Sequence, residues 1–390
     1  MGNGHRERGS ERRRVYESND PGRRERRAGA IIGDVSDLAQ EGLNRMRSTG
    51  RAAFAVLAAV LAAVVVAGCG GGDEPSTSGG GSGGGASSGA TPIRIAFSTW
   101  NGYIGIVIGV KEGLFEKAGV KVDYTIVEDP VQRFNALKSG SLDAIATTPD
   151  TFSRTYANGI ETVQVLGLDA SQGGDGIVAE KSVQSVADLK GQKVGVSAGS
   201  TSQWFLAYVL DQNGLSLDDV EQVDMTSGDA GSAFAAGRIP AAVTWEPWLS
   251  KTEKNPDGHV LVSSEKYPTI ITDQVAFTPD FIKQHPDSVR RFIKGYQAAV
   301  DFLHSNEDQA FEDVADYLGQ TPDEIKATLK TVPVWGVKES QDYYGTKDDP
   351  GPIYDIFKKS GEFWKGLGEI DSVPDPKGAI DPSFVQQAAG

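Results

Sequence analysis

Reactive residues are scarce in this sequence. It has one cysteine, four histidines and three methionines among 390 residues. The single thiol, on Cys69, excludes an intrachain disulfide framework. Beyond residue 68 the histidines are His259, His285 and His304, and none has another histidine, a cysteine or a carboxylate at metal-ligand spacing. We therefore expect solvated surface histidines, no metal site and no cofactor.

Motifs for catalysis are missing as well. No Gly-x-Ser-x-Gly elbow is present, and GVSAGST (195–201) lacks the lysine of a phosphate-binding loop. Catalysis by an isolated Tyr, Glu or Lys leaves no sequence pattern, so that alternative stays open. We assign no catalytic residue and expect a protein that binds rather than an enzyme.

Basic residues are few in most of the chain. Removing the 12 Lys and Arg and the 8 Asp and Glu of residues 1–68 from the totals of 38 and 53 leaves 26 and 45, a net charge of −19. A strongly acidic body argues against nucleic acid or an anionic membrane surface as partner. An anionic ligand stays compatible, because a local site can oppose the overall charge.

The N-terminal segment predicts export. The first 45 residues show no apolar periodicity, which is typical of disorder. Arg47 and Arg51 then flank the apolar run Ala52–Gly68, whose 17 residues are short for a membrane span and match a signal-peptide core. Met46 heads this segment and is an alternative start to Met1. We predict that residues 1–68 are an n-region and signal peptide.

Val66–Cys69 resembles a bacterial lipobox, in which cleavage precedes the cysteine and the thiol carries lipid. The alternative is a cysteine buried in a membrane anchor helix. The Gly- and Ser-rich composition directly after Cys69 favours the lipobox. Residues 69–91 then read as a lipidated cysteine and a flexible tether. We expect a lipid-anchored protein on the outer face of the bacterial cytoplasmic membrane, at the cell surface or in the periplasm.

From Thr91 onward, strands and helices alternate. Apolar alternation predicts a strand at Ile93–Phe97 and another at Val120–Val127, with a helix over Ile104–Ala118 between them that ends at Gly119. Repetition of this pattern with short Gly-capped joints predicts an α/β fold with a largely parallel sheet. About 300 residues are long for one core and suit two lobes.

The second half of this region repeats the first. KVGVSAGSTSQW (193–204) echoes RIAFSTWNGYIG (94–105), and AFAAGRIPAAVTWEP (233–247) echoes ALKSGSLDAIATTPD (136–150). Both matches have an offset of 97–99 residues. Two related β-α-β-α-β units are therefore expected. Ligands of such sheets bind outside the carboxyl ends of the strands, so the loops there are the candidate site.

Hydroxyl groups mark two of these loops. Ser200 and Thr201 begin a predicted helix, whose backbone N–H groups suit an anionic or oxygen-rich ligand. Thr148 and Asp150 occupy the corresponding loop of the first unit. The alternative for each is an ordinary helix N-cap.

Aromatic residues mark the other loops. Trp100, Asn101 and Tyr103 follow the first strand, where we expect the rings to wall a cleft rather than fill a core. Trp245 and Glu246 occupy the repeat-related loop, where a ring beside a carboxylate suits a planar or cationic ligand. The alternative is a Trp that fastens its loop to the lobe.

A glycine-rich turn, LDASQGGDG (168–176), lies where the chain first crosses between the lobes. Asp169, Ser171 and Asp175 stand beside glycines that allow unusual backbone angles. This composition indicates a hinge, where ligand contact and closure are coupled. The alternative is a simple surface turn.

The order of several motifs resembles a known family. These are W-x-G-Y (100–103), G-V-K-E-G-L-F (109–115), D-A-S-Q-G-G-D-G (169–176), S-V-A-D-L-K-G-Q-K-V-G-V (185–196), A-F-A-A-G (233–237) and T-W-E-P (244–247). Together they are similar to the nitrate/sulfonate/taurine class of ABC-transporter substrate-binding proteins. Residues 93–260 match this class well, and the later helices match in general character.

The resemblance implies a type II periplasmic-binding-protein fold with a ligand cleft between two lobes. Residues 92–180 and 266–390 would form the first lobe and residues 181–265 the second. The closed form would capture a small-molecule solute and dock on ABC permease subunits in the membrane. Matching positions give these cleft candidates: Trp100, Asn101, Tyr103, Thr148, Asp150, Asp169, Ser171, Ser200, Thr201, Trp245 and Glu246.

The identity of the solute stays open at this level. A sulfonate, taurine or nitrate is the family default, whereas the carboxylates also suit urea, guanidine-like compounds or pyrimidines. The arginines Arg133, Arg154 and Arg238 lie within or beside predicted helices, so we expect none of them in the cleft loops. Two other functions compete with solute capture: an enzyme on the same fold, and a surface adhesion or sensor module.

Overall fold

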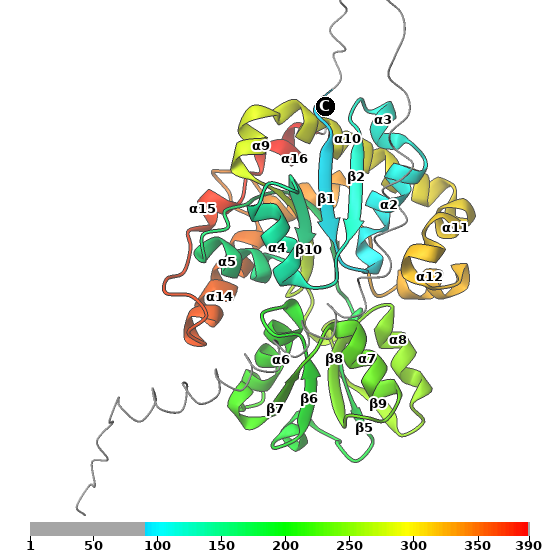
Figure 1. Cartoon of the computed structure of the whole chain (residues 1–390), viewed down its shortest axis with the longest axis vertical. Coiled ribbons are helices and arrows are strands. Elements are labelled where there is room, and N and C mark those ends of the chain that lie inside the picture. The colour runs from blue at the N-terminus through cyan, green and yellow to red at the C-terminus, as the bar shows by residue number, and fades with distance from the viewer. Residues whose placement is uncertain (1–89, 389–390) are drawn as a thin grey trace, which may run out of the picture. The chain divides into compact units, whose positions relative to one another are not determined.

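The computed structural model describes residues 90–388, which lie in one unit of the chain (Figure 1). The predicted n-region, signal peptide, lipidated Cys69 and most of the tether fall outside the described residues. Within residues 90–388, no helix is both long and apolar enough to span a membrane.

The first lobe is built on a five-stranded sheet in the order β2-β1-β3-β10-β4. Its strands are β1 (Ile93–Phe97), β2 (Val122–Ile126), β3 (Ala144–Thr147), β4 (Val163–Ala170) and β10 (Thr272–Phe277). β1 pairs in parallel with β2 and β3, whereas β10 runs antiparallel to β3 and β4. Every residue of β3 and of β10 is buried, as expected for strands covered on both faces.

The second lobe is built on a sheet in the order β7-β6-β8-β5-β9. Its strands are β5 (Asp175–Glu180), β6 (Lys193–Val196), β7 (Glu221–Asp224), β8 (Ala241–Trp245) and β9 (Gly258–Ser263). β6 pairs in parallel with β7 and β8, and β5 is antiparallel to β8 and β9. The two orders correspond strand for strand, so the repeat found in the sequence is also a repeat of topology.

One predicted boundary is wrong by a strand. β5 pairs with β8 and β9, so the second sheet begins at Asp175 and not after residue 180. The chain crosses between the lobes through residues 171–174 and returns between Ser263 and Thr272. A short buried apolar strand looks alike in either sheet, because only its pairing partners tell the two apart.

The helix predicted over Ile104–Ala118 is two helices, α2 (Ile104–Lys111) and α3 (Leu114–Lys117). Between them Gly113 adopts a left-handed conformation with φ 62°, which ends the first helix. A 3₁₀ turn, η1 (Asn101–Tyr103), connects β1 to α2. Three further helices follow parallel strands of the two sheets: α4 (Pro130–Lys138), α5 (Pro149–Ala157) and α6 (Thr201–Asp211).

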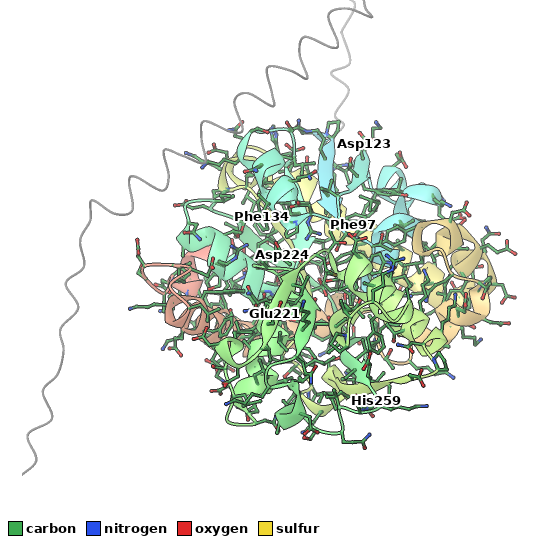
Figure 2. The ribbon with its side chains drawn as sticks, turned by 60° about the horizontal axis from the view of Figure 1, so that its bottom comes forward. Phe97, Asp123, Phe134, Glu221, Asp224 and His259 are labelled. Atoms are coloured by element: carbon green, nitrogen blue, oxygen red, sulfur yellow. The ribbon has the colours of Figure 1, made fainter. Side chains whose placement is uncertain are left out.

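The C-terminal helices pack back on the first lobe, as the sequence predicted (Figure 1). The main ones are α9 (Pro279–Gln284), α10 (Pro286–Ser305), α11 (Glu307–Leu318), α12 (Pro322–Thr328), α13 (Val337–Tyr344) and α14 (Pro352–Gly366). Phe292 of α10 stacks on Phe115 with ring centroids 5.0 Å apart. Figure 2 shows Phe97 and Phe134 in the first lobe and Glu221 and Asp224 on the second.

Candidate functional site

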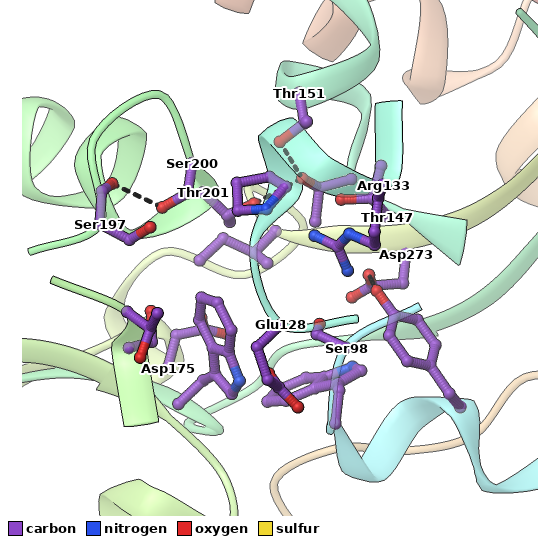
Figure 3. Close-up of a pocket in the computed structure, with 18 residues that line it drawn as sticks. Ser98, Glu128, Arg133, Thr147, Thr151, Asp175, Ser197, Ser200, Thr201 and Asp273 are labelled. Carbon is purple, nitrogen blue, oxygen red and sulfur yellow. Dashed lines mark hydrogen bonds between the residues drawn. The ribbon is translucent and has the colours of Figure 1, made fainter. Parts of the chain in front are cut away.

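A cavity lies between the two sheets, at the ends where their parallel strands finish (Figure 3). Its volume is about 40 Å³, enough for only a few water molecules, so the lobes are closed on it. Loops after β1, β2, β3, β6, β7 and β8 reach it, as does the start of β5 and of β10. The lining residues are Ser98, Trp100, Tyr103, Glu128, Pro130, Arg133, Thr147, Thr148, Thr151, Asp175, Ser197, Ser200, Thr201, Thr226, Ser227, Trp245, Ile271 and Asp273.

Six of the eleven candidate residues line this cavity: Trp100, Tyr103, Thr148, Ser200, Thr201 and Trp245. Asn101 is buried behind it, where Nδ2 donates to Gln320 Oε1 at 2.8 Å. Asp150, Asp169 and Ser171 are buried beside the cavity without lining it, and Glu246 lines a separate groove. Which of these residues touch a solute stays a prediction.

Arg133 corrects the expectation that the arginines lie outside the cleft. Asp129 caps α4 by accepting from Gln132 N at 3.1 Å, and this helix start brings Arg133 against the cavity. The side chain is 4% exposed, and its Nε and Nη1 have no hydrogen-bond partner among the described residues. Burial lowers the pKa of Arg133, although the neighbouring Tyr103, Glu128 and Asp273 oppose this. Helical position alone does not tell which side chain faces a cleft.

Two buried carboxyl groups share the floor of the site. Asp169 and Asp273 are directly opposite each other across β4 and β10. Trp100 Nε1 donates to Asp169 Oδ2 at 3.2 Å, and the Tyr103 hydroxyl donates to Asp273 Oδ1. Burial raises the pKa of Asp273 to about 7 and holds the pKa of Asp169 well above its ordinary value. Asp273 had no signal in the sequence, because its strand lies far along the chain from its partners.

A third carboxyl group, that of Asp175, also lines the cavity. It is 3% exposed, and its Oδ2 has no partner among the described residues. Burial raises the pKa of Asp175 to about 8, with a smaller upward contribution from neighbouring carboxylates. The sequence placed Asp175 only in a hinge-like turn.

Hydroxyl groups join the two lobes across the cavity. Thr148 Oγ1 and Thr201 Oγ1 are 2.6 Å apart, one from each lobe. The capping alternative holds for Ser200, which accepts from Ser202 N at 3.2 Å. It does not hold for Thr148, whose side chain makes no cap bond to α5. Thr148 Oγ1 is therefore left to face the opposite lobe.

Asp150 lies in the first turn of α5 and is fully buried. Its backbone oxygen accepts from Trp364 Nε1 of α14 at 2.9 Å. Burial raises the pKa of its carboxyl group to about 6, because hydrogen bonds from Thr148 and Thr151 compensate only in part.

Trp100 and Tyr103 are both core and wall. They line the cavity, yet they are only 4% and 3% exposed and belong to the first-lobe core. The expectation of wall rather than core is therefore wrong as an either-or choice. A Cβ on Gly102 would lie 1.8 Å from Asp169 Oδ2, so glycine is required for this close approach.

Trp245 and Glu246 have different roles. Trp245 Nε1 of the second lobe donates to Thr99 O of the first at 3.1 Å, and the ring lines the cavity. Glu246 accepts from Ser250 N at 3.1 Å and from Ser250 Oγ at 2.7 Å, which fixes the start of the short helix α8 (Trp248–Lys251). The geometry thus separates the predicted pair.

Histidine and metal chemistry lie away from this cavity. His259 stands on β9 at the lower edge of the second lobe (Figure 2), and no histidine is among the lining residues. His259 and His285 are half-buried, so the expectation of fully solvated histidines holds only for His304. Residues 90–388 contain no group of three His, Cys, Asp or Glu placed to hold a metal ion.

Comparison with known proteins gives the relatives of the chain. A family described as NMT1/THI5 like matches residues 100–310. A putative aliphatic sulfonates-binding protein of Bacillus subtilis is 28% identical over 287 residues, covering 71% of this chain and 81% of the relative. The taurine-binding periplasmic protein of Escherichia coli is 26% identical over 287 residues, covering 70% and 86%.

Solved structures share the fold. The alkanesulfonate-binding protein SsuA of Xanthomonas axonopodis has a TM-score of 0.63 at 18% identity and covers 75% of this chain and 99% of its own. The desulfurization enzyme DSZB has a TM-score of 0.55 at 15% identity and covers 76% and 98%. At these identities the likeness shows the fold alone, which binding proteins and an enzyme have in common. The chain has the type II periplasmic-binding-protein fold that its motifs predicted, and it belongs to the NMT1/THI5-like family.

Proposed function

We propose that this protein is the extracytoplasmic solute-binding component of an ABC importer, and that it captures a small solute with an anionic group of sulfonate type. The observation that carries this proposal is the buried Arg133 guanidinium, which faces the cleft with two unpartnered nitrogens. An unpaired buried charge is costly, so a site that keeps one is suited to an anion. Relatives named for sulfonate and taurine binding support the same solute class.

Binding and closure are coupled in this proposal. The first lobe presents Arg133, and the second lobe brings Ser200 and Thr201 at the start of α6 over the solute. The N-terminus of a helix favours negative charge and offers free N–H groups. Closure also forms the Thr148–Thr201 hydroxyl contact, and the closed form then docks on the permease.

A passive receptor is favoured over an enzyme. The described lining has hydroxyl, carboxyl, guanidinium and aromatic groups but no cysteine or histidine. These groups hold a solute, whereas the fold itself does not decide, since an enzyme shares it. A second candidate solute, a urea-, guanidine- or pyrimidine-like compound, is favoured by the buried Asp175 and Asp273, which accept N–H donors.

The binding proposal is tested by a thermal-shift screen of the purified protein against sulfonates, taurine, nitrate, urea, guanidine and pyrimidines. A solute that binds only the folded state raises the melting temperature by mass action. We expect sulfonates to raise it and Arg133→Met to abolish the rise. No shift with any compound, or chemical turnover of a compound that binds, would contradict the proposal.

We further propose that lipid on Cys69 holds the protein at the outer face of the membrane, which supports delivery to a membrane permease. Cys69→Ala is expected to release the protein from the membrane fraction while leaving the affinity for solute unchanged. Fractionation followed by immunoblotting measures the first effect, and the thermal-shift screen measures the second. A membrane-bound Cys69→Ala variant would instead indicate an anchor helix.

A further inference from the structure

The solute site contains a group that an anion alone does not use. Asp175 is the first residue of β5, is 3% exposed and lines the cavity. Its Oδ2 has no hydrogen-bond partner among the described residues. A buried carboxyl oxygen without a donor is costly, and a sulfonate oxygen placed against it would add repulsion. The group therefore suits a donor that the solute brings.

The backbone around Asp175 is held rigidly. Its N–H donates to Ser171 Oγ at 3.0 Å, and Ser171 Oγ lies 2.7 Å from Ser264 Oγ on the returning chain segment. Gly174 leaves no room for a side chain, because a Cβ there would lie 2.8 Å from Cη2 of Trp100. Both crossings between the lobes thus fix the position of this carboxyl group. A preorganised group of this kind selects a ligand without an ordering cost.

Arg133 and Asp175 stand apart in the cavity. Figure 3 shows them on opposite sides of the enclosed space, with Glu128 between them in that view. Glu128 is already engaged, since Oε1 accepts from Thr99 N at 3.0 Å and from Thr99 Oγ1 at 2.7 Å. The cleft thus offers an unpartnered guanidinium on one side and an unpartnered carboxyl oxygen on the other.

We propose that the solute is a short zwitterion, with an oxyanion group against Arg133 and a protonated amine against Asp175, and that Asp175 selects amine-bearing solutes over their amine-free analogues. This inference rests on the proposed function and narrows its solute class. The pairing satisfies both buried groups with one molecule, whereas nitrate or an unsubstituted alkanesulfonate leaves Asp175 without a donor. The small cavity, about 40 Å³, favours a short chain between the two charged ends.

The test compares two-carbon compounds that differ only at their ends: taurine, β-alanine, ethanesulfonate and ethylamine. Isothermal titration of the purified wild-type protein is expected to give at least about tenfold tighter binding for a zwitterion than for either singly charged compound, since a hydrogen bond between charged groups discriminates by this factor or more. Taurine and β-alanine distinguish a sulfonate head from a carboxylate head. This series needs no variant, so it does not depend on a substitution folding.

Asp175→Asn is then expected to lose the preference for the amine while binding ethanesulfonate within about twofold of the wild type. Glu246→Gln is the matched carboxyl-to-amide control, because Glu246 holds α8 and does not line the cavity. Ethanesulfonate binding as tightly as taurine, or an amine preference retained by Asp175→Asn, would overturn the inference and leave the proposed function standing. Failure of every sulfonate, amine and zwitterion to bind would overturn the proposed function itself.

Discussion

The two lobes have the same strand order and present different chemistry to the cleft they share. The first lobe contributes charged and aromatic groups: Trp100, Tyr103, Glu128, Arg133 and Asp273. The second lobe contributes mainly hydroxyl groups: Ser197, Ser200, Thr201, Thr226 and Ser227. One repeated turn has therefore been used for two purposes, since W-N-G-Y follows β1 where G-S-T follows β6.

A physical reason for this division lies in desolvation. In the proposed closure, each group in the cleft loses water when the lobes meet. A neutral hydroxyl group loses much less hydration free energy than an ion does. The first lobe, whose core also includes the C-terminal helices, can hold buried ions in place. Asp175 is the one carboxyl group that the second lobe contributes to the lining.

The largest expected effect contrasts the two tryptophans. Trp100→Ala removes a side chain that is 4% exposed in the first-lobe core, so the free energy of unfolding should fall by about 3–5 kcal/mol. Trp245→Ala removes a half-buried ring of the second lobe and should cost about 1 kcal/mol. Urea unfolding without solute measures both. Equal small losses would mean that Trp100 serves only as a cleft wall.

The next effect concerns charge in the first lobe. Arg133→Met should weaken solute binding by about 3 kcal/mol, or roughly a hundredfold, because the anion loses its buried cation. Arg238→Met, at an exposed position of the second lobe, is the control and should leave affinity unchanged. Calorimetric titration measures both variants. A wild-type affinity in Arg133→Met would move the anion site to the second lobe.

A smaller effect is the pH dependence of stability. The pKa of Asp175 is about 8 in the folded protein, against an ordinary value of 3.8. The folded state therefore binds more protons than the unfolded chain between these values, and stability should fall as the pH rises from about 4 to about 8. The carboxyl groups of Asp273, Asp150 and Glu246 face Asp175 and push its pKa in the same direction.

Asp175→Asn should flatten this slope by up to about 1.4 kcal/mol per pH unit. It should not abolish the slope, because Asp273, with a pKa of about 7, contributes with the same sign. Urea midpoints at pH 5, 6, 7 and 8 measure the slope, with the exposed Asp123→Asn as control. Parallel curves for the wild type and Asp175→Asn would show that Asp175 ionises normally in the folded protein.

The smallest effect concerns the contact between the lobes. Thr148→Val and Thr201→Val should each weaken solute binding by about 1 kcal/mol, because each removes the same hydroxyl contact from the closed form. The double variant should lose little more than either single one, as a double-mutant cycle requires for directly interacting groups. Fully additive losses would show that the two hydroxyl groups act independently.

Local patterns in the sequence predicted much of the fold. Strand Ile93–Phe97 and helix Pro352–Gly366 were visible as apolar periodicity, and the second unit was visible as a repeat with an offset of 97–99 residues. Loops at strand ends gave Trp100, Thr148, Ser200 and their neighbours at the cavity. Arg133 was missed because a helical residue carries no local sign of its orientation. Asp273 was missed because β10 reaches the site only through long-range pairing with β3 and β4.

The sequence by itself determined the α/β pattern, the two related units and the strand-end loops that meet at the cleft, because periodicity, capping and repeats are local properties of a chain. Only the tertiary structure decided which charges face the solute. Burial and missing partners distinguish Arg133 and Asp175 from other arginines and aspartates, and both depend on segments far apart in the chain. The free energy of desolvating a charge is set by everything packed around it, and no single segment encodes that surrounding.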